Sequence, residues 1–196
     1  MTAVDERIEM AETSGGPTLD ELFEALERMP VPEGYKVEIV GGAVYMTPQR
    51  SVHWQIIFRI IQSLEDKFGR DVNVLSDVRI DFPGAGNGFC PDVVKLRTGA
   101  VPDSREQWSY DDIEFIAEVI SKDTARNDYG PKKTAYAVAE IPVYLIADPY
   151  QGKCHIYTEP KNGEYTSELP VAFGLEVDLT QTVLELTLPT DKFRRG

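Results

Sequence analysis

The sequence predicts an α/β (α+β) fold in which helices flank a mixed β-sheet. Apolar residues recur with helical spacing over residues 19–29, 51–68 and 124–139. Between and after these segments lie short β-branched and aromatic runs bounded by turn residues, as in strands. The 196 residues are enough for one domain, and the first sixteen residues show no periodicity. We therefore expect a flexible tail over residues 1–16 and a single domain over residues 17–196.

The N-terminal part of the domain predicts a helix followed by a hairpin. Thr18 and Glu21 have the spacing of a capping box, which places a helix start at this point. Residues 35–46 then read as two short strands joined by Gly41 and Gly42, since paired glycines favour a tight turn. A second helix follows over residues 51–68.

The central part predicts three strands, a helix and a further strand. The strands are expected at Val72–Phe82, Phe89–Leu96 and Ile113–Ile120, and the helix runs from about Thr124 to Ala139. The next strand is Val143–Ala147, and a strand–helix–strand order predicts that the two flanking strands lie parallel. Further strands are expected at three later segments: 153–158, 164–169 and 175–188.

The charge of the chain is unusual for a protein that binds nucleic acid. The net charge is −13, whereas DNA-binding domains are usually basic. Residues 1–38 account for −7 of this and residues 39–158 for only −3, so the charge weakens a nucleic-acid interpretation without excluding it. The sequence has no signal-peptide pattern and no apolar run of the roughly 18–20 residues that a membrane helix needs. We therefore expect no membrane partner and a cytoplasmic location.

Two carboxylates stand in apolar strands. Asp92 follows Pro91 at the start of one strand, and Glu118 lies within another. An ionised side chain in a buried strand is unfavourable unless it is paired or coordinates a cation. Mg²⁺ and Mn²⁺ prefer oxygen ligands, and they activate water and stabilise the charge on a phosphate. The pair therefore predicts a metal-dependent phosphodiesterase site; alternatively, Asp92 lies in a turn and Glu118 pairs with an arginine.

The helix after Glu118 carries Asp128, Lys132 and Tyr136 at four-residue spacing, which places them on one face. A lysine near the carboxylates would orient water or stabilise developing charge. Lys132 lies roughly 12 Å along the helix axis from the end of the strand that carries Glu118, so its side chain must point back over the sheet to reach the carboxylates. Lys133, the next residue, is the other candidate for this role. A surface ion pair between Asp128 and Lys132 is the alternative interpretation.

Two further residues are candidates for supporting roles. Glu38 lies between Val37 and Ile39 on a predicted strand, where it is either a third carboxylate of the site or a residue on the solvent side of the hairpin. His53 begins the second helix, and a lone histidine is more often structural than catalytic. The sequence contains no zinc signature and no serine–histidine–aspartate order.

Several of these segments resemble a known family. The matching pieces are VEIVGGAVYMTP, His53, Pro91-Asp92-Val93-Val94, AEVISKDTARNDYGPKKTAY and IPVYLIADP. In this order they resemble the Uma-two-type restriction endonucleases, a branch of the PD-(D/E)XK nuclease superfamily. The resemblance covers roughly residues 18–158. It implies a restriction-endonuclease-like mixed sheet flanked by helices, with an additional N-terminal helix and hairpin and C-terminal strands.

The resemblance also implies a function and roles for individual residues. It implies a Mg²⁺- or Mn²⁺-dependent DNA endonuclease, in which Asp92 and Glu118 are the metal ligands and Lys132 is the active-site lysine. A homodimer would allow such an enzyme to cut both strands. Four other residues fall on motif positions with less defined roles: Glu38, His53, Asp128 and Tyr136. The alternative is a catalytically inactive nuclease-fold protein that acts through protein–protein contacts.

One position departs from the superfamily pattern. A lysine is expected two residues after Glu118, and Ile120 stands there instead. The resemblance implies that Lys132 supplies this lysine from the following helix, and Lys122 is a less favoured candidate. The sequence alone leaves the choice among Lys122, Lys132 and Lys133 open.

Overall fold

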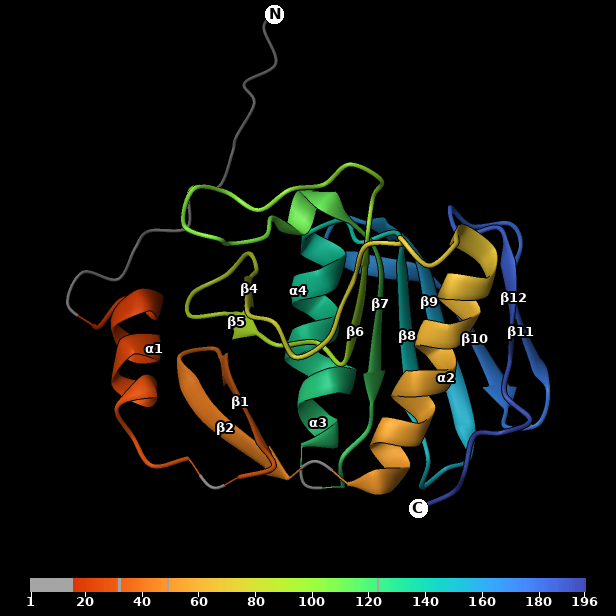
Figure 1. Cartoon of the computed structure of the whole chain (residues 1–196), viewed down its shortest axis with the longest axis horizontal. Helices are drawn as coiled ribbons and strands as arrows, with labels where there is room; N and C mark the ends of the chain where they lie inside the picture. Colours follow the sequence, from red (N-terminus) through yellow and green to blue (C-terminus); the bar gives the residue numbers. More distant parts are fainter. Residues whose placement is uncertain (1–15, 32, 49, 123) are drawn as a thin grey trace, which may run out of the picture.

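The computed structural model describes residues 16–196 except residues 32, 49 and 123. The predicted tail therefore lies outside the described residues apart from Gly16. In the described part of the chain, the strands form a six-stranded sheet, a four-stranded sheet and a two-stranded hairpin, with helices packed against them (Figure 1). The predicted combination of helices with mixed strands is confirmed, but the strands are divided among separate sheets. No helix among these residues is long and apolar enough to cross a bilayer.

The six-stranded sheet has the order β10-β9-β8-β7-β6-β3. Its strands are β3 (Val74–Leu75), β6 (Val93–Leu96), β7 (Ile113–Val119), β8 (Val143–Asp148), β9 (Lys153–Lys161) and β10 (Glu164–Ala172). As predicted, β7 and β8 pair in parallel, whereas the other neighbours within this sheet are antiparallel. The strand that carries Glu118 is therefore internal to the sheet.

The smaller sheet has the order β2-β1-β5-β4 and is preceded by a capped helix. Its strands are β1 (Tyr35–Val40), β2 (Ala43–Pro48), β4 (Ile80–Asp81) and β5 (Gly88–Phe89). Gly41 and Gly42 join β1 to β2 with φ values of 57° and 77°, which glycine adopts without strain. The capping box of Thr18 and Glu21 begins α1 (Leu19–Glu27). The predicted helix and hairpin are both confirmed.

Two predicted strands are wrong as continuous elements. The segment Val72–Phe82 divides into β3 and β4, and Phe89–Leu96 divides into β5 and β6, so each crosses from one sheet to the other. Asp77 has a φ of 58° in the first break, and Pro91 in the second cannot donate a backbone hydrogen bond to a ladder. The N–H of Asp77 donates to the carbonyl of Pro91 at 3.1 Å. The two crossings therefore meet directly beside Asp92.

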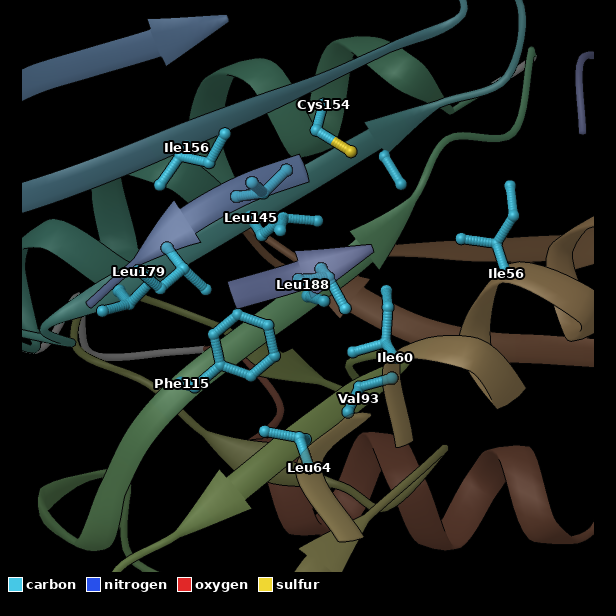
Figure 2. Packing of buried hydrophobic residues seen from close by; sticks show 14 of the residues in the cluster. Ile56, Ile60, Leu64, Val93, Phe115, Leu145, Cys154, Ile156, Leu179 and Leu188 are labelled. Carbon is cyan, nitrogen blue, oxygen red and sulfur yellow. The ribbon is translucent and has the colours of Figure 1, made fainter. Parts of the chain in front are cut away.

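One face of the six-stranded sheet packs against α2 (Ser51–Phe68) and a C-terminal hairpin (Figures 1 and 2). Phe115, Ala117 and Val119 of β7 share this core with Ile60 of α2, because alternate residues of a strand point to one side. The hairpin consists of β11 (Glu176–Leu179) and β12 (Leu186–Pro189). The segment 175–188, predicted to supply short strands, therefore divides between these two strands.

The opposite face lies beneath the helical segment that follows β7 (Figure 1). This segment consists of α3 (Ala125–Asn127), the π-helical turn η2 (Asp128–Lys132) and α4 (Lys133–Val138), and a short 3₁₀ turn η1 (Tyr110–Asp112) precedes β7. The regular helix predicted over residues 124–139 is therefore interrupted. Pro131 lies inside the π turn, where the missing N–H removes a regular helical hydrogen bond. Ile116, Glu118 and Ile120 point toward this side of the sheet, opposite to the α2 face.

The packing of α2 gives a test of the fold. Ile60 is 1% exposed and lies within the core between α2 and the sheet. Ile60→Ala is expected to lower the free energy of unfolding by about 2–5 kcal/mol, because it removes buried methyl groups and leaves a cavity. Urea unfolding measures this change. Glu65→Ala, on the exposed side of the same helix, is the control and is expected to change stability by less than about 0.5 kcal/mol; equal losses would contradict this packing.

Candidate active site

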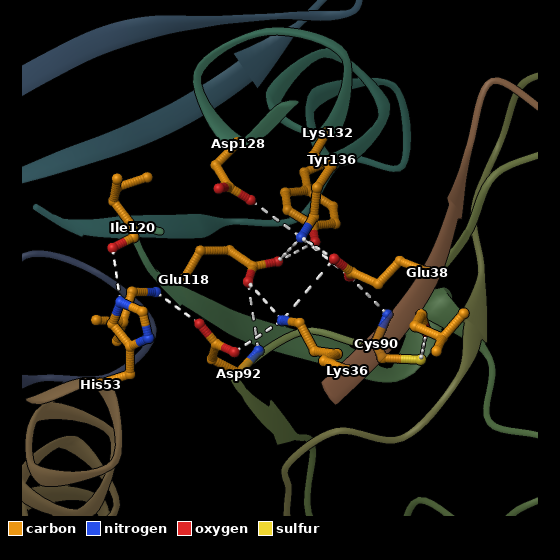
Figure 3. Close-up of polar contacts among 12 residues, drawn as sticks. Lys36, Glu38, His53, Cys90, Asp92, Glu118, Ile120, Asp128, Lys132 and Tyr136 are labelled. Atoms are coloured by element: carbon orange, nitrogen blue, oxygen red, sulfur yellow. Dashed lines mark hydrogen bonds and ion pairs between the residues drawn. The ribbon is translucent and has the colours of Figure 1, made fainter. Parts of the chain in front are cut away.

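Six side chains of the described residues, four carboxylates and two lysines, are linked by ion pairs in a cluster where β1, β7, the segment before β6 and the π turn meet (Figure 3). We call it the carboxylate–lysine cluster, and its members are Lys36, Glu38, Asp92, Glu118, Asp128 and Lys132. Glu118 and Lys132 are each only 1% exposed. Burial of this much charge is tolerated only because the opposite charges contact one another.

Lys132 reaches the strand carboxylates directly. Its Nζ lies 2.6 Å from Oε1 of Glu118, 3.0 Å from Oε1 of Glu38 and 3.0 Å from Oδ1 of Asp128. The helical segment packs over the face to which Glu118 points, and side chains on a helix lean toward its N-terminus, which here is the end nearest to Glu118. Of the competing lysines, Lys133 lies over the ring of Tyr157 at 4.7 Å, and Lys122 is exposed.

Asp92 and Glu118 are adjacent and are held by defined donors. Oδ2 of Asp92 accepts the backbone N–H of Val119 at 2.7 Å. The hydroxyl of Tyr136 donates to Oε1 of Glu118 at 2.7 Å, and the backbone N–H of Asp92 donates to Oε2 of Glu118 at 3.4 Å. Among the described residues, the ionic partners of Glu118 are Lys36 and Lys132 rather than the arginine of the alternative interpretation. The crossing at Pro91 thus brings Asp92 to Glu118.

Glu38 takes part in the ion pairs of the cluster, whereas His53 lies beside the cluster and contacts the backbone. Glu38 is buried rather than on the solvent side of the hairpin, and its Oε1 accepts the N–H of Cys90 at 2.9 Å. His53 is also buried, and its Nε2 lies 2.8 Å from the carbonyl oxygen of Ile120. His53 therefore connects α2 to the end of β7, outside the ion pairs of the cluster.

Lys36 belongs to the cluster, although the sequence interpretation did not single it out. Its Nζ lies 2.8 Å from Oδ1 of Asp92, 3.7 Å from Oε2 of Glu118 and 3.8 Å from Oε2 of Glu38. The signal that could have found it is its position two residues before Glu38 on β1, because residues at this spacing share one face of a strand.

The charges of the cluster do not balance. Four carboxylates face two ammonium groups. Burial raises the pKa of Glu118 to about 8, although Lys132 and Lys36 act in the opposite direction. Burial also acts against ionisation of Glu38, but Lys132 and Lys36 hold its pKa below the ordinary value. The excess negative charge means that the cluster favours uptake of a proton or a cation.

A small cavity opens beside the carboxylates. Its volume is about 20 Å³, which is room for a single water molecule. The residues that line it include Lys36, Asp92, Glu118 and Asp128 but not Lys132. In the described residues, no group of three or more histidine, cysteine, aspartate or glutamate side chains is arranged to hold a metal ion. The donor chemistry nevertheless fits Mg²⁺, because the carboxylate oxygens are hard ligands and the cluster has excess negative charge.

The mixed sheet thus brings Asp92 and Glu118 together, and Lys132 reaches Glu118 from the helical segment that follows β7. The chain belongs to the Uma2 family, described as "Putative restriction endonuclease", whose model matches residues 22–191. It is also similar to a solved structure described as a "putative nuclease belonging to DUF820" from Anabaena variabilis ATCC 29413. That match has a TM-score of 0.67 and 15% identity, covers 91% of this chain and 97% of the other, and shows the fold alone. The comparison with curated proteins gives no match.

Proposed function

We propose that this protein is a divalent-metal-dependent DNA endonuclease that hydrolyses phosphodiester bonds. The observation that carries the proposal is the convergence of Asp92, Glu118 and Lys132 from separate segments into one buried cluster beside a cavity. Membership of the Uma2 family supports the same reaction class. Two copies of the chain, each with one such site, would act on the two DNA strands.

Each residue of the site has a proposed role that its contacts support. Asp92 and Glu118 would hold Mg²⁺ or Mn²⁺, and a bound cation supplies activation of water and neutralisation of phosphate charge. The backbone N–H of Val119 orients Asp92, and the hydroxyl of Tyr136 orients Glu118. Lys132 is held behind the carboxylates and fixes Glu118 in place. Glu38 and Asp128 in turn hold Lys132.

Cleavage of supercoiled plasmid tests the proposal. The wild-type protein is expected to nick the plasmid in Mg²⁺ or Mn²⁺ and to be inactive in EDTA, and linear product would agree with two sites that act together. Asp92→Ala and Glu118→Ala are expected to reduce the rate by at least about 100-fold, because even outer-shell partners of metal ligands contribute 10–100-fold. Folding of each variant is checked by circular dichroism.

The alternative is a protein with a nuclease fold that acts through protein contacts without catalysis. The net charge of −13 favours it, because phosphate contacts need lysine and arginine side chains. The plasmid experiment separates the two functions. Equal nicking by the wild-type protein and both alanine variants, or no nicking with either cation, would reject the endonuclease and favour the alternative.

A further inference from the structure

Two lysines belong to the carboxylate–lysine cluster, and they differ in what they face. Lys132 is 1% exposed and is absent from the cavity wall. Lys36 lines the cavity together with Asp92 and Glu118. A substrate phosphate that approaches the opening of this cavity would therefore meet Lys36, because Lys132 is not among the residues that line it.

The Lys36 ammonium lies among carboxylates that a cation would otherwise contact. Its Nζ lies within 3.8 Å of oxygens from Glu38, Asp92 and Glu118, with the shortest contact, 2.8 Å, to Asp92. These three carboxylates are the oxygen donors that a divalent cation would use on this side of the cluster. The ammonium and the cation therefore compete for the same oxygens, since both cannot neutralise them at once.

We propose that Lys36 is the substrate-facing lysine of this site: it fills the place of the divalent cation when no cation is bound, and it contacts the substrate phosphate once a cation displaces it. The proposal rests on the proposed endonuclease function and extends it. A lysine suits this exchange because its ammonium is a point charge on a flexible four-carbon stem. Lys132 is held more closely, because oxygens of three carboxylates lie within 3.0 Å of its Nζ, whereas Lys36 has only one contact that short.

Calorimetric titration of Mg²⁺ and Mn²⁺ into the purified protein without DNA tests the first part. Lys36→Met is expected to tighten cation binding by at least about tenfold, because it removes a competing charge at contact distance. Lys133→Met is the matched control: it removes the same charge from a residue outside the cluster and is expected to leave cation affinity unchanged. Unchanged or weaker binding by Lys36→Met would overturn the competition.

Cleavage at saturating Mg²⁺ tests the second part. Lys36→Met is expected to lose about 100-fold or more in rate, the typical effect of removing one donor to a developing negative charge. Tighter cation binding combined with slower cleavage is a result that a purely structural role would not give. Undiminished cleavage by Lys36→Met at saturating Mg²⁺ would overturn the phosphate contact. Failure of the endonuclease proposal is distinguishable, because the wild-type protein would then also be inactive while the calorimetry still reports on Lys36.

Thermal unfolding covers the case in which Lys36→Met is too unstable for titration. Loss of Lys36 leaves Asp92 without its shortest ionic partner, so the variant is expected to unfold at a lower temperature in EDTA. Added Mg²⁺ is expected to raise the Tm of Lys36→Met by more than it raises the Tm of the wild-type protein. An equal or smaller rise would contradict the proposal. Lys36→Arg keeps the positive charge and is therefore expected to show a smaller Mg²⁺-dependent rise in Tm than Lys36→Met.

Discussion

Lys132→Met is expected to lower the free energy of unfolding by about 3–5 kcal/mol, the range measured when one partner of a buried ion pair is removed. Methionine keeps most of the length of the side chain, so the loss reports the charge rather than a cavity. Without Lys132, the carboxylates of Glu38, Glu118 and Asp128 lose an ammonium that contacts all three within 3.0 Å. Urea unfolding in EDTA measures the change. Plasmid cleavage is expected to fall as well, because Glu118 loses the contact that orients it.

Lys133→Met is the matched control for this experiment. Lys133 is the next residue of the same helical segment, but its ammonium lies over the ring of Tyr157 and not in the cluster. Because such a contact contributes about 0.5–1 kcal/mol when exposed, its loss is expected to be several-fold smaller than that of Lys132→Met. Comparable losses in the two variants would show that the cluster does not depend on Lys132.

The part of the site that could be predicted from the sequence is the part with a local signal. Asp92 and Glu118 stand out because each interrupts an apolar run, and Asp128, Lys132 and Tyr136 follow from helical spacing. The signal for Lys36 is weaker, because its spacing from Glu38 on one strand face is ordinary for a lysine of a hairpin until its burial is known. Its inclusion depends on how the small sheet packs over the large one, and sequence periodicity carries no information about that contact.

The errors in the fold have two origins. The break between β5 and β6 follows from Pro91, and the π turn coincides with Gly130 and Pro131, so both had a local signal in the sequence. The break between β3 and β4 depends on the positive φ of Asp77, a conformation that aspartate adopts only occasionally. The assignment of each short strand to one sheet or the other is decided by tertiary pairing, which alternating hydrophobicity does not specify.

Lys132→Met combined with Asp128→Asn is expected to recover part of the stability that Lys132→Met alone loses. The two side chains form an ion pair at 3.0 Å, and removing both charges leaves fewer unpaired carboxylates in the cluster. The recovery expected from residues in direct contact is roughly 0.5–3 kcal/mol. Urea unfolding of the wild type, the two single variants and the double variant measures it. Lys132→Met with Asp191→Asn, which changes an exposed carboxylate outside the cluster, is expected to show no recovery.

The same double variant separates the structural role of Lys132 from its role in the reaction. If Lys132 acts by positioning Glu118, the double variant regains stability but stays slow in cleavage, because the contact of 2.6 Å between Lys132 and Glu118 is still missing. If Lys132 only balances charge, cleavage returns together with stability. The first outcome would leave Lys36 as the lysine that faces the substrate and Lys132 as the residue that holds the carboxylates in place for it. The second outcome would show that the position of Glu118 is determined by Tyr136 and the sheet alone.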